Sequence, residues 1–211
     1  MLPPPTADMT EKPQPAAIYY VEVADAPNNS FGEPDRSPAG LEWYERFHAR
    51  HNQGKLEKWM LDYFPQNINV EPSESGLTDF IATHVGYCVS PRAKNLIEEL
   101  EPGTHQFIPV LVRCASQKQR YYILRIGNSR DCYDLSRSDV RWRSTYARGQ
   151  EIKFWIKRAA RPIAFLRSEV GQMQLFQNDT GFPMILVSQH LHDLFEENGI
   201  SGLKYERQVV V

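Results

Sequence analysis

Hydrophobic and polar residues alternate in short runs along most of the chain, and these runs predict strands. Residues 18–24 (IYYVEVA), 105–114 (HQFIPVLVRC) and 120–127 (RYYILRIG) are rich in β-branched and aromatic side chains, as strands are. The polar segment ASQKQ between the last two predicts a hairpin turn. Two more strands are expected in 150–168, on either side of Arg161-Pro162, and one in the closing GISGLKYERQVVV.

One pattern occurs twice, at 89–100 (VSPRAKNLIEEL) and at 187–198 (VSQHLHDLFEEN). In both copies a short apolar run ends at a serine, which predicts a buried strand followed by a helix whose N-cap is that serine. The apolar positions then recur at spacings of three and four, as on one face of a helix: Ala93, Leu96, Ile97 and Leu100, and Leu191, Leu194 and Phe195. The two glutamates in each copy are expected to face water, and Pro102-Gly103 and Gly199 to end the helices. The repeat therefore favours a duplicated scaffold over a duplicated active site.

The remaining segments are less regular. Residues 25–40 predict a turn-rich loop, 41–65 a helix broken at Gly54, and 131–142 an irregular connector that ends near a strand. Together these elements predict an α+β fold, a single domain at 18–211 with a mixed, mainly antiparallel sheet and a few peripheral helices. Residues 1–17 contain five prolines and few large apolar side chains, so they predict a disordered tail.

Composition limits the setting in which the chain acts. The 211 residues are 41% hydrophobic, which is enough for a globular core, and contain no apolar run of membrane-spanning length. The N-terminal segment has neither the basic nor the apolar region of a signal peptide, so a cytoplasmic protein is expected. Cys88, Cys114 and Cys132 are odd in number and widely spaced, which favours reduced, buried thiols.

Charge is unevenly distributed. The chain has a formal net charge of −2, but residues 137–167 contain nine lysines and arginines and two acids, a local excess of seven positive charges. Within 150–157 the sequence alternates, so Ile152, Phe154 and Ile156 would lie on one strand face and Lys153, Trp155 and Lys157 on the other. This segment is interpreted either as the solvated face of a sheet or as a functional patch.

No cluster of residues predicts catalysis or metal binding. His48 and His51 lack a third ligand at zinc spacing, and His190 and His192 would point in different directions on a helix. His84, Cys88, His105 and Cys114 do not have the spacing of compact ligand pairs. Phosphate loops and nucleophile elbows are absent. We therefore expect a non-enzymatic protein without metal or cofactor, although a hydrolase that uses His84, His105 or Cys88 stays open as an alternative.

Four stretches, taken in order, carry a family resemblance: YCVSPRAKNLIEELEPGTHQFIPVLV, YYILRI, DLSRSDV and ILVSQHLHDLFEENGISGLKYER. They resemble the immunity protein eleven family of bacterial polymorphic toxin systems, formerly a domain of unknown function. The resemblance covers roughly residues 55–207, without residues 1–40, and is most specific in the ending Leu-Phe-x-x-x-Gly-x-x-Gly-Leu at 194–203. The recurrent Asp134–Asp139 motif, DLSRSD, predicts a turn in which Asp and Ser side chains bond nearby amides.

The resemblance implies a cytoplasmic protein that binds and neutralises a cognate toxin. Arg, Trp and Tyr are favoured interface anchors, so we place the partner-binding patch in the basic segment, at Arg141, Trp142, Arg143, Tyr146, Arg148, Lys157 and Arg158. A nucleic-acid-binding module that uses residues 137–167 is the alternative. The acidic surface around Glu71–Asp79 is the other possible location of the interface.

Overall fold

The structure is a computed structural model, which describes residues 17–23, 55–62, 64–70, 76–83, 86–147, 150–157, 163–178 and 185–211. For Trp142, 145–147 and 150–157 it describes only the backbone. The predicted tail at 1–17 and loop at 25–40 lie outside these residues, apart from Ala17, as does most of the predicted broken helix at 41–65. The division into a tail and one domain stays a prediction.

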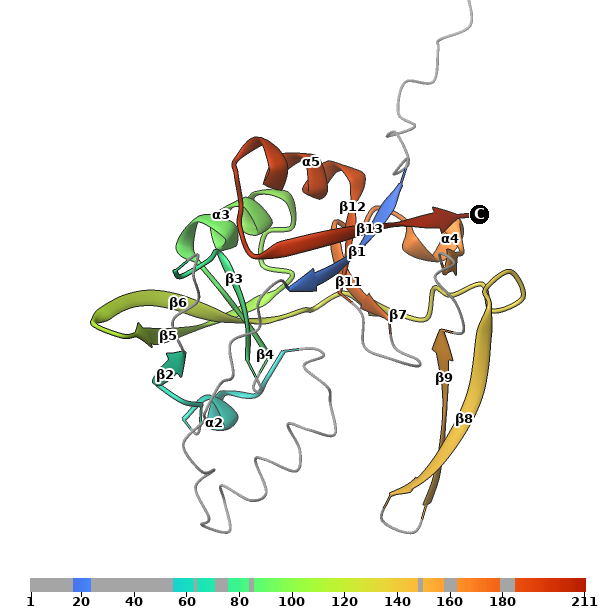
Figure 1. Ribbon diagram of the computed structural model, residues 1–211, viewed down its shortest axis with the longest axis horizontal. Helices are drawn as coiled ribbons and strands as arrows, with labels where there is room; N and C mark the ends of the chain where they lie inside the picture. Colours follow the sequence, from blue (N-terminus) through green and yellow to red (C-terminus); the bar gives the residue numbers. More distant parts are fainter. Residues whose placement is uncertain are drawn as a thin grey trace, which may run out of the picture.

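The described strands and helices follow one another along the chain as labelled in Figure 1. The helices are α2 (Lys58–Leu61), α3 (Pro91–Leu100), α4 (Arg167–Val170) and α5 (Gln189–Glu197). The strands are β1 (Ile18–Val23), β2 (Asn67–Val70), β3 (Phe80–Thr83), β4 (Gly86–Val89), β5 (Gln106–Cys114), β6 (Gln117–Arg125), β7 (Ser129–Arg130), β8 (Val140–Ala147), β9 (Gln150–Lys157), β10 (Ala164–Phe165), β11 (Leu175–Asn178), β12 (Ile185–Ser188) and β13 (Leu203–Val210).

These strands form two larger sheets and a hairpin. One sheet has the order β10-β13-β1-β12-β11-β7, the other β2-β5-β6-β4-β3, and β8 pairs with β9. Most pairs are antiparallel, and the parallel ones are β2 with β5, β10 with β13, and β7 with β11. The predicted α+β fold with mixed, mainly antiparallel pairing is confirmed, and its strands are divided between sheets.

The two larger sheets share one topology. Strands β3, β4, β6, β5 and β2 correspond in order to β11, β12, β1, β13 and β10, with three antiparallel pairs followed by one parallel pair in each sheet. We call β2, β3, β4, α3, β5 and β6 the first repeat. The second repeat contains β10, β11, β12, α5 and β13 and takes its remaining strand, β1, from the other end of the chain.

The duplicated sequence pattern occupies the same place in both repeats. Ser90 and Ser188 are the N-caps of α3 and α5, and their hydroxyl groups accept hydrogen bonds from Ala93 N at 3.2 Å and Leu191 N at 3.1 Å. Pro91 stands at the start of α3, where a missing N–H costs nothing. The two predicted helices and the strands before them are therefore confirmed, and the pattern marks a duplicated scaffold.

A shared core joins the repeats. Helices α3 and α5 pack against each other, and the rings of Phe80 and Phe195 meet with centroids 5.6 Å apart. Apolar side chains from both sheets and both helices pack in this cluster, among them Val21, Phe80, Val89, Ala93, Ile97, Leu124, Leu175, Val187, Leu191 and Phe195. Each buried large apolar side chain contributes roughly 1.5–3 kcal/mol, so the two repeats stabilise each other.

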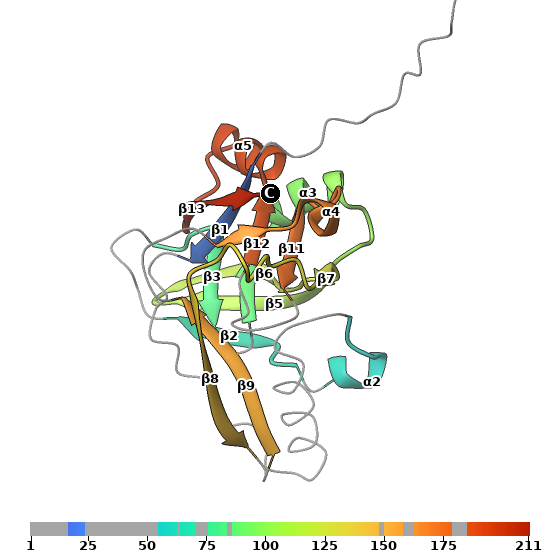
Figure 2. The same ribbon diagram turned by 90° about the vertical axis from the view of Figure 1, so that its right-hand side faces the viewer.

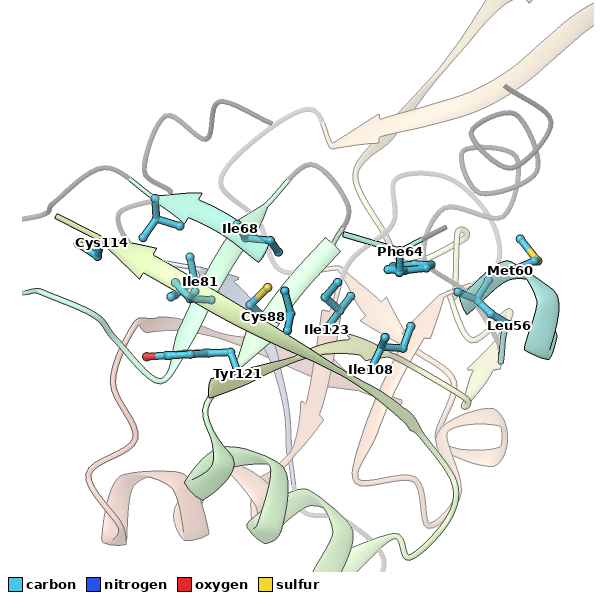
Figure 3. Close-up of a cluster of buried hydrophobic side chains, with 13 residues drawn as sticks. Leu56, Met60, Phe64, Ile68, Ile81, Cys88, Ile108, Cys114, Tyr121 and Ile123 are labelled. Atoms are coloured by element: carbon cyan, nitrogen blue, oxygen red, sulfur yellow. The ribbon is translucent and has the colours of Figure 1, made fainter. Parts of the chain in front are cut away.

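The outer face of each larger sheet carries a second cluster. Behind the first repeat, Ile68, Ile81, Cys88 and Ile123 belong to one cluster with Met60 of α2 (Figure 3). Behind the second repeat, side chains from β1, β10, β11, β12 and α4 form the corresponding cluster, with Ile18, Phe165, Val170, Phe176 and Leu186. All three cysteines are buried and free, as expected.

Two details differ from the prediction. The turn of the β5–β6 hairpin is only Ala115 and Ser116, because strand pairing continues to Cys114 opposite Gln117. The predicted five-residue turn was too long, since Gln117, Lys118 and Gln119 are polar but paired. Residues 140–142 were expected in the irregular connector and no element was predicted for 143–147, yet 140–147 form β8, which pairs along its length with β9.

Candidate functional site

The serine of each copy is hydrogen-bonded to the residue just before β3 or β11. Ser90 donates from its hydroxyl to Asp79 Oδ1 at 2.6 Å and from its amide to Asp79 O at 2.8 Å. Ser188 makes the same two bonds to Gln174, through the side-chain Oε1 and the backbone O. An N-cap hydroxyl held in this way positions a helix, so the geometry supports the scaffold interpretation of both serines.

Each repeat also binds the start of a strand in the other repeat, β3 in the first and β11 in the second. Asp79 Oδ2 accepts hydrogen bonds from the amide and the hydroxyl of Ser201, which follows α5, both at 3.0 Å. Glu101, which follows α3, accepts from the amides of Gln174 at 2.9 Å and Leu175 at 3.0 Å. The two contacts are reciprocal, because the segment after each helix binds the start of β3 or β11 in the opposite repeat.

In this arrangement the pKa values of both carboxyl groups are lowered, which favours their charged form. Burial alone would raise the pKa of Asp79, but its hydrogen bonds, that of Arg92 foremost, outweigh burial and lower the pKa. Burial also opposes the charge of Glu101, but hydrogen bonds from His105 and from backbone amides lower its pKa. Sequence reasoning missed both residues, because their partners are distant in the chain.

The ending Leu-Phe-x-x-x-Gly-x-x-Gly-Leu is explained by the same contact. Gly199 follows α5 with φ of +60°, the left-handed conformation that favours glycine. A Cβ at Gly202 would lie 2.5 Å from Phe80 O. Only glycine lets the loop after α5 approach β3 closely enough for Ser201 to bind Asp79.

Of the residues considered for a hydrolase, the two that the structure describes, His105 and Cys88, do not form a nucleophile–base pair. His105 is buried, its Nε2 lies 2.8 Å from Glu101 Oε2, and its Nδ1 accepts from Gly127 N at 3.2 Å. Burial raises the pKa of the Cys88 thiol to about 12, so the reactive thiolate is disfavoured. His84 lies outside the described residues. The roles that the structure shows for His105 and Cys88 are structural.

The histidine pairs of the sequence are candidates for metal ligands. His48 and His51 lie outside the described residues. His192 stacks on Tyr19 with ring centroids 4.0 Å apart and contacts Asp193 through Nδ1 at 2.8 Å, so its ring packs on the sheet. In the part of the chain that the structure describes, no group of three or more His, Cys, Asp or Glu side chains could hold a metal ion.

The basic segment is built on the DLSRSD turn. Asp134 Oδ1 accepts from the amides of Ser136 at 3.0 Å and Arg137 at 3.3 Å, as the motif predicted. Two hydrogen bonds then fasten the turn to β10: Asp134 N donates to Ala164 O, and Ala164 N donates to Ser138 Oγ. The motif therefore holds the base from which β8 and β9 extend.

The hairpin β8–β9, which we call the arm, projects away from both larger sheets in Figure 1 and Figure 2. Val140 at its base packs against the outer cluster of the second repeat. Arg141 and Arg143 are exposed to solvent. The arm thus presents cations at a distance from the core.

Strand register divides the predicted patch between the two faces of the arm. Arg141 stands opposite Ile156 and Arg143 opposite Phe154, while Trp142 stands opposite Trp155. Because alternate residues of a strand lie on opposite faces, the positions of Arg141 and Arg143 share one face. The positions of Trp142, Tyr146 and Lys157 share the other. Arg148 and Arg158 lie outside the described residues.

Trp155 is a position that sequence reasoning did not include in the patch. It stands opposite Trp142 in the register, in which Ala147 stands opposite Gln150. Strand β8 was not predicted, because the basic residues of 137–148 obscured the strand pattern.

None of the helices in the described ranges has the length and apolar character needed to cross a membrane.

The fold and the arm define the class: an α+β protein in which two similar sheet-and-helix repeats support a projecting hairpin with exposed arginines. A family model described as the Immunity protein family (Imm11) matches residues 27–210. The chain therefore belongs to this immunity protein family, as the resemblance in the sequence indicated. The match also takes in residues 27–54, which that resemblance had left out. No curated protein matches the sequence.

Proposed function

We propose that this chain protects a bacterial cell from a cognate toxin of a polymorphic toxin system by binding the toxin directly in the cytoplasm, without catalysis. Membership of the Immunity protein family (Imm11) carries the proposal. The site geometry adds support, because Ser90, His105 and Cys88 have structural roles. The interface should bury about 1,600 Å² or more in total, as stable protein complexes do.

The arm is the proposed contact surface, with Arg141, Trp142, Arg143, Tyr146, Arg148, Lys157 and Arg158 as its partner-binding residues. Arginine and aromatic residues are common anchors of interfaces. The exposed arginines predict that the toxin presents a carboxylate-rich surface to the arm, and opposite charges would speed association at low salt.

The function is tested by co-expressing the chain with the toxin encoded beside it. The expected outcome is rescue of growth and a complex that copurifies. If the chain forms no complex and cells die, the proposed function is wrong. Binding of the purified chain to nucleic acid, with an affinity that falls steeply with salt, would favour the alternative function.

The arm is tested with the double variant Arg141→Glu/Arg143→Glu. Because both charges are reversed on one exposed face, we expect affinity for the toxin to fall at least tenfold, or about 1.4 kcal/mol, and the melting temperature to stay within a few degrees. A Trp142→Ala variant tests the other face separately. The control is Arg130→Glu/Arg207→Glu, which reverses two exposed arginines on β7 and β13. If the arm variants bind the toxin as tightly as the control variant does, the interface lies elsewhere.

A further inference from the structure

Pairing in the β5–β6 hairpin of the first repeat extends further than the pairing described for β1 and β13. The latter ends at Ile18 opposite Gln208, and Val110 opposite Tyr121 is the corresponding pair of the first repeat. Four further pairs, from Leu111↔Arg120 to Cys114↔Gln117, lie beyond it. Residues 111–120 are the distal part of the β5–β6 hairpin.

The distal part of the hairpin is basic. Arg113 and residues 115–120 are exposed, and 111–120 contain three cations, Arg113, Lys118 and Arg120, without an acidic residue. Arg113 stands opposite Lys118, and the alternation of the strand puts Arg120 on the same face. Within the described residues, none of the three forms an ion pair with a carboxylate. Like charges held side by side favour an anionic partner.

The same face carries cations over aromatic rings. Lys94 of α3 has its Nζ 5.3 Å from the ring centroids of both Phe107 and Tyr122, and Arg120 lies 5.8 Å from Tyr122. In the second repeat the corresponding place holds His192, which contacts the rings of Tyr19 and Tyr205. Lys94 also bonds Glu98. At this position the first repeat thus holds a lysine where the second holds a histidine.

We propose that Lys94, Arg113, Lys118 and Arg120, which we call the basic tip, bind a carboxylate-rich segment of a polypeptide. The inference rests on the proposed function, because the polypeptide would belong to the toxin. The basic tip and the arm extend toward opposite sides of the molecule in Figure 1, so their contributions are separable by mutation.

A polypeptide fits this surface better than a nucleic acid. The tip has only four cations, of which Lys94 is paired with Glu98, so it could neutralise only a few phosphates. The half-buried ring of Tyr122 already has Lys94 and Arg120 over it, so it is not free to stack a base, as single-strand binding requires. A few carboxylates would match the small number of cations at the tip.

The test uses Lys118→Glu/Arg120→Glu, with Lys118→Gln/Arg120→Gln as a milder second variant. We expect the charge reversal to weaken binding of the inactivated toxin at least tenfold at low salt, with a smaller effect at high salt, because screening weakens exposed pairs. Arg130→Glu/Arg207→Glu is again the control. Toxin affinities of both tip variants within twofold of that of the wild-type chain would overturn the inference while the proposed function stands.

A second probe separates the inference from the proposed function. Poly-L-glutamate should bind the wild-type chain at low salt and bind Lys118→Glu/Arg120→Glu much more weakly, while the control retains binding. Equal binding of poly-L-glutamate by the wild-type chain and the tip variant would overturn the inference. Loss of single-stranded oligonucleotide binding in the tip variant, without a change in poly-L-glutamate binding, would show that the tip recognises nucleic acid. Failure of the wild-type chain to bind the toxin contradicts the proposed function instead.

Discussion

Two carboxylates, Asp79 and Glu101, fasten the ends of one repeat to the other. Each accepts hydrogen bonds from backbone amides of the opposite repeat, and the side chain of Asp79 is only 11% exposed. Hydrogen bonds to a charged group contribute about 1.5–3 kcal/mol each in favourable cases. Loss of either carboxylate should therefore loosen the contact between the repeats.

We expect Asp79→Asn to lower the free energy of unfolding by about 2–3 kcal/mol at pH 7. The amide can still accept from Ser90, but its NH₂ group would face the amide of Ser201. Because the pKa of Asp79 is lowered in the folded state, its stabilising effect is present above the pKa of the unfolded chain, about 3.9, and is lost as pH falls through the folded value.

Urea denaturation between pH 7 and pH 2 measures this difference. The gap between the wild-type chain and Asp79→Asn should shrink as pH falls below about 4. Glu99→Gln, which changes an exposed acid on α3, serves as the control. A gap that is constant across the whole pH range would show that the charge of Asp79 does not contribute.

At this scale the sequence predicted residues whose partners are local. The caps Ser90 and Ser188 and the turn residue Asp134 follow from neighbours within three positions, and the structure confirms them. The roles of Asp79 and Glu101 depend on residues more than 70 positions away, such as Gln174 and Ser201. No local pattern contains that information.

The strand–serine–helix element is the unit that the chain repeats. Its two copies differ at the acceptor of the serine hydroxyl, which is the carboxylate of Asp79 in one and the neutral amide of Gln174 in the other. A hydrogen bond to a charged acceptor is the stronger of the two. The two copies therefore allow a comparison of the same serine N-cap with a charged acceptor and with a neutral one.

We expect Ser188→Ala to lower the free energy of unfolding by about 1–2 kcal/mol, as the loss of an N-cap does, and Ser90→Ala to lower it further. Both variants should still neutralise the toxin under conditions in which they remain folded. Chemical denaturation and a growth assay measure the two outcomes. Ser116→Ala, in the exposed turn of β5–β6, is the control. Loss of protection by a folded Ser90→Ala variant would contradict the scaffold role.

Periodicity predicted most elements with their limits close to those observed, since strands such as β1 and β5 and helices such as α3 and α5 have clear apolar patterns. It failed to predict β8, whose residues include Arg141, Arg143 and Ser144 and which extends away from the core. The cations at Arg141 and Arg143 leave β8 without the regular apolar alternation that identified β9 at 150–157. The arm was therefore predicted as a basic segment with one strand and not as a hairpin.

At the scale of the whole molecule, the second repeat depends on a strand from the far end of the chain. Strand β1 lies between β12 and β13, and Ile18 pairs with both Ser188 and Gln208. In the first repeat the corresponding strand, β6, follows β5 through a two-residue turn. Sequence reasoning identified both strands but not their equivalence, because sheet order arises from non-local pairing.

A circularly permuted chain tests this equivalence. It begins at Asp25, runs to Val211 and continues through a linker of about four Gly-rich residues into residues 17–24, so that β13 and β1 form a hairpin like β5–β6. We expect its free energy of unfolding to lie within about 1–2 kcal/mol of that of the original chain, because the same strands pair. Denaturation by urea, followed by circular dichroism, provides the measurement.

The matched control is a chain that begins at Asp25 and lacks β1 altogether. Without the strand between β12 and β13, the second repeat loses pairing on both sides, and we expect it to unfold far more readily. If the permuted chain is no more stable than this truncated one, the linker has not restored β1 to its place. β1 and β6 would then occupy corresponding places in their sheets, but β1 could not be joined directly to β13 as β6 is joined to β5.

The position of β1 also bears on how the protein folds as it is synthesised. Translation produces β1 before β12 and β13, so this strand leaves the ribosome long before either neighbour exists. The first repeat, by contrast, is contiguous, and its pairs can form while the rest of the chain is still being made. An unpaired apolar strand is an aggregation hazard. The sheet of the second repeat therefore cannot close before β13 has left the ribosome, and β1 stays without both of its neighbours until β12 and β13 have been made.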